Sequence, residues 1–143
     1  MLPVMLEMPE RFPDLNFVIA GAPSQTEGFY KNIIGDKRVS LVQNETYDLL
    51  TRAETAIVTS GTATLETGLY GVPEVVVYKA HPISYLIGKR LMKVEHMSLV
   101  NLILNRRAVP ELLQGLFNPD DLASTLQDLR KQEKREELTQ DFV

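Results

Sequence analysis

Short apolar runs of β-forming residues alternate with longer stretches of helical pattern along the chain, and this alternation limits the folds available to it. Four runs qualify as strands, at residues 17–20, 38–42, 55–59 and 74–78. Between them the pattern predicts helices at 25–34, 46–53 and 62–70. Strands that alternate with helices are typical of βαβ units, in which the strands are parallel. The sequence therefore predicts an α/β fold, with a parallel sheet covered by helices on both faces.

The fourth strand is the most apolar, because Val75, Val76 and Val77 follow one another without a polar residue. Such continuous apolarity suits a central strand that is buried on both faces. Beyond this strand the pattern becomes helical, and we predict helices at 82–92, 99–104, 109–114 and 119–132. A further helix is expected near the N-terminus at 2–10, and a charged one near the C-terminus at 131–138.

The length of 143 residues fits one domain with one core. We find no linker long enough to divide the chain, so residues 1–143 are expected to form a single domain. The chain opens in a predicted helix with no strand before it and closes in a charged helix without a cap. We therefore expect a fragment of a longer protein, with an incomplete sheet.

Composition excludes several classes of function. The chain has 15 Lys and Arg against 19 Asp and Glu, a net charge of −4, so it lacks the broad basic surface of a nucleic-acid-binding protein. It contains no cysteine and only two histidines, His81 and His96, so we expect neither disulfides nor a metal site. No apolar run approaches the roughly 20 residues of a membrane-spanning helix. The first eight residues do not resemble a signal peptide.

The segment richest in chemical information is Thr-Ser-Gly-Thr-Ala-Thr-Leu-Glu at residues 59–66. A buried strand enters a small, hydroxyl-rich turn there and then a helix, whose first N–H groups have no partner within the helix. Such N–H groups and the helix dipole favour a bound phosphate. Gly61 would permit the close backbone approach of a diphosphate, and Glu66 could accept hydrogen bonds from a vicinal diol such as a ribose. The competing explanation is structural, with Ser60 as an N-cap and Glu66 as an acidic residue that favours the helix start.

Several motifs, in the same order, resemble the lipid-A-disaccharide synthase family. They cover most of residues 12–129 and comprise residues 59–66, Gly-Val-Pro at 71–73, Val-Val-Val-Tyr at 75–78, Lys-Arg-Leu at 89–91, Ser-Leu-Val-Asn-Leu at 98–102 and Val-Pro-Glu-Leu-Leu-Gln at 109–114. The resemblance implies the C-terminal half of a GT-B glycosyltransferase, a Rossmann-like domain that binds the UDP moiety of a nucleotide sugar. A Gly-Ser-Arg loop, which the family places at the start of this domain, does not occur before Leu2.

The resemblance also implies roles for individual residues. Backbone amides and hydroxyls of the turn would hold the diphosphate, and Glu66 would bind the ribose. Asn101 would reach the phosphate or the transferred sugar. Val42 and Gln43 would border the uracil. The residues of the turn are Ser60, Gly61, Thr62 and Ala63.

The implied reaction is an inverting glycosyl transfer. The full enzyme would move 2,3-diacylglucosamine from UDP-2,3-diacylglucosamine to 2,3-diacylglucosamine 1-phosphate, and so form lipid A disaccharide 1-phosphate and UDP. The catalytic base and the acceptor site would lie in a preceding domain, so residues 1–143 alone should be inactive. The resemblance implies no cofactor, a cytoplasmic location at the inner membrane of a Gram-negative bacterium, and a homodimer as one option for the full-length enzyme.

Basic residues gather around the predicted helix at 82–92, which also carries Tyr85, Leu86 and Met92. A basic amphipathic helix favours anionic membrane surfaces, so this helix is a candidate for peripheral membrane contact. The alternative is an ordinary solvated helix face. The basic residues are Lys79, Lys89, Arg90 and Lys93.

Three other readings compete with the resemblance. A UDP-N-acetylglucosamine 2-epimerase or a peptidoglycan glycosyltransferase would share the strand–turn–helix layout, although those families tend to carry a second glycine where this chain has Thr62. A non-catalytic Rossmann-like binding or interaction module is the second alternative, and it would be favoured if the chain bound no nucleotide. A nicotinamide dehydrogenase is disfavoured because no Gly-x-Gly-x-x-Gly follows the first strand, where Pro23 stands in the turn.

Overall fold

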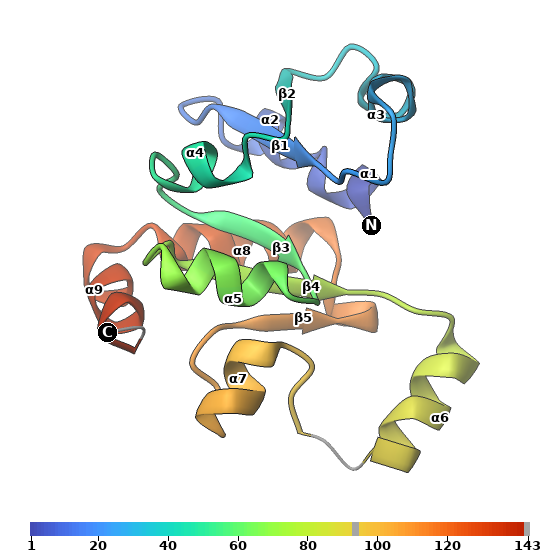
Figure 1. Ribbon diagram of the computed structural model, residues 1–143, viewed down its shortest axis with the longest axis vertical. Helices are drawn as coiled ribbons and strands as arrows, with labels where there is room; N and C mark the ends of the chain where they lie inside the picture. Colours follow the sequence, from blue (N-terminus) through green and yellow to red (C-terminus); the bar gives the residue numbers. More distant parts are fainter. Residues whose placement is uncertain (93–94, 142–143) are drawn as a thin grey trace. The chain divides into compact units, whose positions relative to one another are not determined.

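The computed structural model describes residues 1–92 and 95–141, and Figure 1 shows its parallel strands and helices. The chain divides into two compact units, Met1–Ala53 and Glu54–Val143, each with its own parallel sheet. The predicted α/β class is confirmed, and all four predicted strands occur within one residue of the expected bounds. The expectation of a single domain stays a prediction.

The first unit contains the two-stranded sheet, in which β1 (Phe17–Gly21) pairs in parallel with β2 (Val39–Gln43). Helix α3 (Glu27–Ile34) connects the two strands. Its N-cap is Thr26, whose hydroxyl accepts a hydrogen bond from the Phe29 N–H at 3.2 Å, and it ends at Gly35 with a φ of 55°. The core of this unit consists of the buried Leu6, Tyr30 and Ile34, with Leu2, Ile19, Ile33, Val39 and Leu41 packed against them.

The helix predicted at 2–10 is two short helices, α1 (Leu2–Met5) and α2 (Met8–Arg11). A continuous helix would need an N–H at residue 9, and Pro9 has none. Arg38 holds the following turn, because its guanidinium donates to the carbonyl oxygens of Pro9 at 2.8 Å and Leu15 at 3.2 Å. The expected helix at 46–53 is also shorter, since α4 spans Thr46–Leu50.

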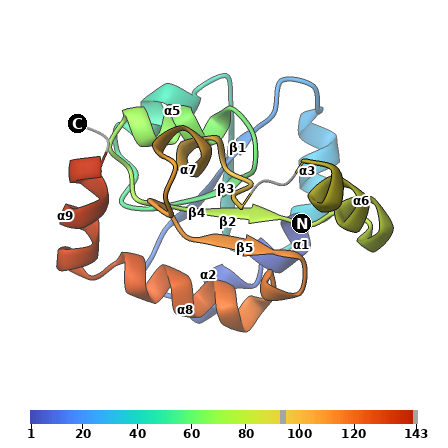
Figure 2. The same ribbon diagram turned by 90° about the horizontal axis from the view of Figure 1, so that it is seen from below.

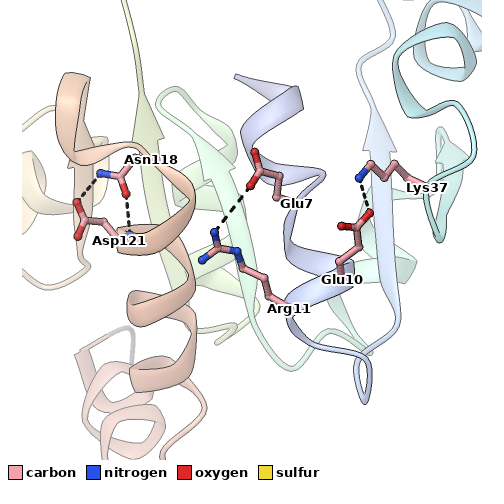
Figure 3. Close-up of polar contacts among 6 residues, drawn as sticks. All are labelled: Glu7, Glu10, Arg11, Lys37, Asn118 and Asp121. Carbon is pink, nitrogen blue, oxygen red and sulfur yellow. Dashed lines mark hydrogen bonds and ion pairs between the residues drawn. The ribbon is translucent and has the colours of Figure 1, made fainter.

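Two ion pairs brace the helical N-terminal segment on its surface. Glu7 pairs with Arg11 one turn later, at 3.8 Å, and Glu10 pairs with Lys37, which follows α3 (Figure 3). The hydrogen bond from Lys37 and its positive charge lower the pKa of Glu10. Exposed pairs of this kind contribute little stability, so the apolar core carries most of the packing energy.

The second unit contains the three-stranded sheet, in the order β3–β4–β5, with all strands parallel. The strands are β3 (Ala56–Thr59), β4 (Glu74–Tyr78) and β5 (Glu111–Leu113). Val75, Val76 and Val77 of β4 have no exposed surface, which confirms the predicted central strand. In Figure 2 the helices α5 (Ala63–Leu69) and α7 (Leu99–Leu104) lie on one face of this sheet, and α8 (Pro119–Leu129) lies on the other.

The helix predicted at 109–114 is wrong, because those residues contain β5 and the start of the 3-10 helix η1 (Gln114–Leu116). Short apolar runs fit a strand and a helix equally well, and here pairing with β4 decides. The carbonyl of Pro110 accepts the Val76 N–H at 2.9 Å, so the parallel ladder begins just before Glu111. A proline at the entrance of a strand at the end of the order removes no ladder donor.

Helix α8 begins at a well-formed cap. The Asn118 side chain accepts the Asp121 N–H at 2.9 Å and donates to the Asp121 carboxylate at 2.6 Å, as Figure 3 shows. The buried stripe Leu122, Leu126 and Leu129 then packs toward the sheet. The remaining helices are α6 (Pro82–Met92) and α9 (Gln132–Asp141), close to the predicted 82–92 and 131–138. Lys93 of the predicted basic cluster lies outside the described residues.

Candidate functional site

The turn that follows β3 is attached to the sheet through Ser60. Ser60 donates its N–H to the Val77 carbonyl at 3.0 Å, and its hydroxyl donates to the Met97 carbonyl at 2.7 Å. Helix α5 has Thr62 at its N-cap position, without a side-chain cap bond. The alternative that Ser60 caps this helix is therefore wrong. Its hydroxyl proton ties the turn to the segment before α7.

After Ser60 the backbone leaves the sheet, and its N–H groups are exposed. Gly61 has a φ of 153°, and a Cβ placed on it would meet no atom within 4 Å. The Gly61 carbonyl is occupied, since it accepts the Thr64 N–H at 3.2 Å and the Thr64 hydroxyl at 2.8 Å. The turn is thus open toward solvent on the side of Gly61, but its return into α5 is fixed.

Three consecutive N–H groups lie in this opening. Among the described residues, no acceptor is found for the N–H of Gly61, Thr62 or Ala63, and all three residues are exposed. They stand at the carboxyl end of β3, the end of a parallel strand at which ligands of open α/β sheets bind. Backbone donors in series can cradle an anionic group of the size of a phosphate.

Glu66 lies one turn into α5 and is half-buried. Its N–H donates to the Thr62 carbonyl at 3.2 Å, so the helix is regular at this point. A carboxylate one turn behind the open N–H groups can accept hydrogen bonds from hydroxyl groups of a ligand held by that turn. The predicted order of a phosphate group followed by a diol is compatible with this spacing.

Asn101 is fully buried, and protein groups occupy its whole side-chain amide. The carbonyl oxygen accepts the N–H groups of Ala108 at 2.7 Å and Val109 at 2.9 Å. The amide nitrogen donates to the Val109 carbonyl at 2.9 Å and to the Glu111 carboxylate at 2.8 Å. With two bonds on each end of the amide, this geometry favours a role in holding the loop between α7 and β5. The predicted contact of Asn101 with a ligand stays untested.

Glu111 is a buried carboxylate that sequence reasoning missed as a separate feature. It accepts the Ser98 N–H at 2.9 Å and the Met97 N–H at 3.1 Å, in addition to Asn101. Burial raises the pKa of Glu111, but these backbone and side-chain hydrogen bonds outweigh burial and hold the pKa below its ordinary value. The carboxylate is therefore ionised at neutral pH. The motif at 109–114 contained this residue, but a helix predicted at 109–114 gave no reason to expect contacts of Glu111 with Met97, Ser98 and Asn101.

Val42 and Gln43 end strand β2 and belong to the first unit. Both are half-buried, and the Gln43 side chain donates to the Gln25 carbonyl at 3.2 Å. A Cβ on the neighbouring Gly21 would lie 3.2 Å from Gln43 and 3.1 Å from Tyr30, so glycine there leaves room for both side chains. Hydrogen bonds join Ser60 and Asn101 into one network within the second unit, and Val42 and Gln43 belong to the first unit.

Residues 1–92 and 95–141 contain neither a candidate metal site nor a candidate membrane-spanning helix. No three His, Cys, Asp or Glu side chains are grouped there in a way that could hold a metal ion. In the same part of the chain, no helix has both the length and the apolar character needed to cross a membrane.

A family model described as lipid-A-disaccharide synthetase matches residues 1–143, the whole chain. The chain belongs to this family. Curated lipid-A-disaccharide synthases are similar along the same span. The protein of Syntrophus aciditrophicus is 37% identical over 99% of this chain, and that of Geobacter sulfurreducens is 36% identical over 88%. The protein of a Sulfurihydrogenibium species is 35% identical over 94%.

The chain spans only part of these relatives, namely 39%, 34% and 40% of their respective lengths. Membership of the lipid-A-disaccharide synthetase family favours the expected reading over the 2-epimerase and the peptidoglycan glycosyltransferase. It also agrees with the parallel α/β architecture of both units. The motifs that suggested the family therefore led to the correct one.

Proposed function

We propose that this chain supplies the UDP-binding part of a lipid-A-disaccharide synthase. The full enzyme would transfer 2,3-diacylglucosamine from UDP-2,3-diacylglucosamine to 2,3-diacylglucosamine 1-phosphate. The observation that carries the proposal is the turn after β3, where three exposed N–H groups in series have no acceptor among the described residues. Family membership supports a nucleotide sugar as the ligand of this turn.

The turn would hold the diphosphate through the N–H groups of Gly61, Thr62 and Ala63. Ser60 contributes differently, because its N–H and its hydroxyl proton are already used within the protein. The lone pairs of that hydroxyl, and the hydroxyl of Thr62, remain as further polar groups beside the ligand. Glu66 would accept hydrogen bonds from the ribose hydroxyls, and Val42 and Gln43 would border the uracil.

The chemistry that this arrangement supports is the departure of UDP. In the transfer, the 6-hydroxyl oxygen of the acceptor forms a bond to the anomeric carbon, and the bond from that carbon to the diphosphate oxygen breaks. The electron pair leaves with UDP, and the hydroxyl proton passes to a base, for which we assign no residue in this chain. N–H groups aimed at the diphosphate would stabilise the charge that develops on it.

Isothermal titration of the chain with UDP tests the proposal. We expect saturable binding to the wild-type chain and binding weakened at least tenfold in Glu66→Ala. A folded wild-type chain that takes up no UDP at millimolar concentration would contradict the proposed role of residues 1–143.

We also propose that α6 faces an anionic membrane surface. Ile83, Leu86 and Ile87 are exposed, with 52 to 66% of their surface accessible. The helix contains no Asp or Glu, and Arg90 on it and Lys79 before it are exposed cations. Apolar side chains flanked by positive charge suit the boundary between headgroups and acyl chains. A lipid-linked substrate would then meet the enzyme where the lipid resides.

A further inference from the structure

The first residue of β5 organises the segment that precedes α7. Glu111 pairs in register with Val76 of β4 and keeps only 7% of its surface exposed. Its side chain accepts hydrogen bonds from Met97, Ser98 and Asn101. A buried carboxylate with this many donors is a rigid anchor, because moving any one donor leaves charge without compensation.

The anchored segment is the one that contacts Ser60. Met97 donates its N–H to the carboxylate of Glu111 and, on the other side of the same residue, accepts the Ser60 hydroxyl at 2.7 Å. Ser98 donates its N–H to Glu111 at 2.9 Å and accepts the Asn101 N–H with its hydroxyl at 3.1 Å, as the N-cap of α7. A continuous chain of bonds thus runs from β5 to the turn after β3.

We propose that Glu111 is a positioning residue for the turn at Ser60, and that it sets the affinity of this turn for the diphosphate of UDP. It acts on Ser60 through the main chain of Met97 and makes no contact with the ligand. Where it concerns UDP, this inference rests on the function proposed above. The fold assigns Ser98 and Asn101 to the same assembly, since they hold the segment and the following loop against the carboxylate.

A carboxylate suits this position better than an amide. One oxygen of Glu111, Oε1, accepts hydrogen bonds from Ser98, Asn101 and Met97, the last at 3.2 Å, and the other, Oε2, accepts only the Met97 N–H, at 3.1 Å, among the described residues. Glutamine at this position keeps one acceptor but turns an NH2 group toward the Met97 N–H, which is itself a donor. Glu111→Gln is therefore a nearly isosteric change that replaces the shorter of the two Met97 bonds by a contact between two donors and leaves Met97 only the bond to Oε1 at 3.2 Å.

The test compares Glu111→Gln, Ser60→Ala and the double variant, using the whole 143-residue chain. Asn118→Ala is the matched control. The Asn118 side chain also makes hydrogen bonds to the backbone of this unit, because it accepts the Asp121 N–H and donates to the Gly115 carbonyl at the start of α8. Two quantities are measured for each variant. One is the amide NMR shifts of residues 60–63, and the other is the UDP dissociation constant by isothermal titration.

We expect Glu111→Gln to shift the amide signals of residues 60–63 and to weaken UDP binding by about five- to tenfold, as for the loss of one good hydrogen bond. Ser60→Ala should weaken binding to a similar extent. The double variant should be no weaker than the poorer single variant, because both break the same link. Asn118→Ala should lower thermal stability and leave both readouts unchanged.

Unchanged signals at 60–63 in Glu111→Gln would overturn the proposal, and so would fully additive losses of affinity in the double variant. A purely structural role for Glu111 predicts lower thermal stability without either change. If the wild-type chain takes up no UDP, the proposed function fails, whereas the NMR signals still decide whether Glu111 sets the position of the turn.

Discussion

The hydroxyl of Ser60 donates to the main-chain carbonyl of Met97 across 2.7 Å, which joins residues 37 positions apart. The turn after β3 is consequently shaped by two neighbours, the sheet below it and the segment before α7. The N–H groups of Gly61, Thr62 and Ala63 come directly after Ser60, whose position these hydrogen bonds fix. An anion site built from backbone groups needs this kind of anchor, since it has no side-chain geometry of its own.

Gly61→Ala should impair UDP binding through backbone strain and not through a steric clash. A Cβ at Gly61 meets no atom within 4 Å, but its φ of 153° is strained for an L side chain, so the turn must change its backbone angles. Gly35→Ala is the control, because Gly35 has a φ of 55° and equally open surroundings. Both variants should lose about 1 kcal/mol of stability or more in urea unfolding. Only Gly61→Ala should weaken UDP in calorimetry, and equal affinities would remove Gly61 from the site.

Glu66→Ala should abolish the preference of the chain for a ribose over a deoxyribose ligand. If the Glu66 carboxylate accepts the ribose hydroxyls, wild-type chain should prefer UDP over 2′-deoxy-UDP by about tenfold, the typical value of one charge-assisted hydrogen bond. Glu66→Ala should bind both ligands with similar, weak affinity. Competition titration measures the two dissociation constants. A preference for UDP that survives the substitution would assign the ribose to another residue.

Glu74→Gln should change how stability depends on pH. Glu74 has no exposed surface, and among the described residues neither of its carboxylate oxygens has a hydrogen-bond partner. Burial raises the pKa of Glu74 to about 9. Between the ordinary value of 4.5 and about 9, the folded chain keeps this proton and the unfolded chain releases it. The folded state therefore binds more protons than the unfolded state. The stabilisation that comes from the protonated Glu74 carboxyl is complete below pH 4.5 and is lost as pH rises toward 9.

The slope of this loss approaches about 1.4 kcal/mol per pH unit. Glutamine carries no ionisable proton, so the curve of Glu74→Gln should be flatter than that of the wild type between pH 5 and 9. Urea unfolding at each pH gives the two curves. Parallel curves would show that the Glu74 carboxyl is hydrated or paired in the folded chain.

Leu86→Ser should reduce binding to anionic vesicles, if α6 meets the membrane. Leu86 is 66% exposed on α6, and transfer of its side chain into the acyl boundary is worth about 2 kcal/mol. Leu69→Ser is the control, because Leu69 is 81% exposed on α5, outside the proposed contact. Co-flotation with phosphatidylglycerol vesicles should fall severalfold for the first variant alone. Equal flotation of both variants would exclude α6 as the contact.

The strands could be predicted because each is a short apolar run with clear punctuation. Glu74–Tyr78 is preceded by Gly71 and Pro73, and its bounds agree with the prediction at both ends. Strand β5 was missed because three residues carry too little periodicity to oppose a helix, and its identity depends on pairing with β4. Local pattern carries no information on such long-range pairing.

The candidate site also has one part that local sequence predicts and another that depends on long-range contacts. The turn at Ser60 and Gly61 was recognisable from residue types, since small and hydroxyl-bearing residues between a strand and a helix are a local signal. The hydrogen bonds of Asn101 and Glu111 were not, because they join residues 8 to 14 positions apart within a folded loop. An asparagine that binds a ligand and one that holds a loop look alike in a sequence.

Met97 takes part in the Ser60 link with its N–H and carbonyl alone. Any amino acid with a main-chain N–H can supply both groups, so these two bonds do not depend on the side chain at this position. Proline, which lacks the N–H, is the exception. Substitutions at position 97 other than proline should therefore keep the connection between the two ends of the assembly, which runs through the main chain of this residue.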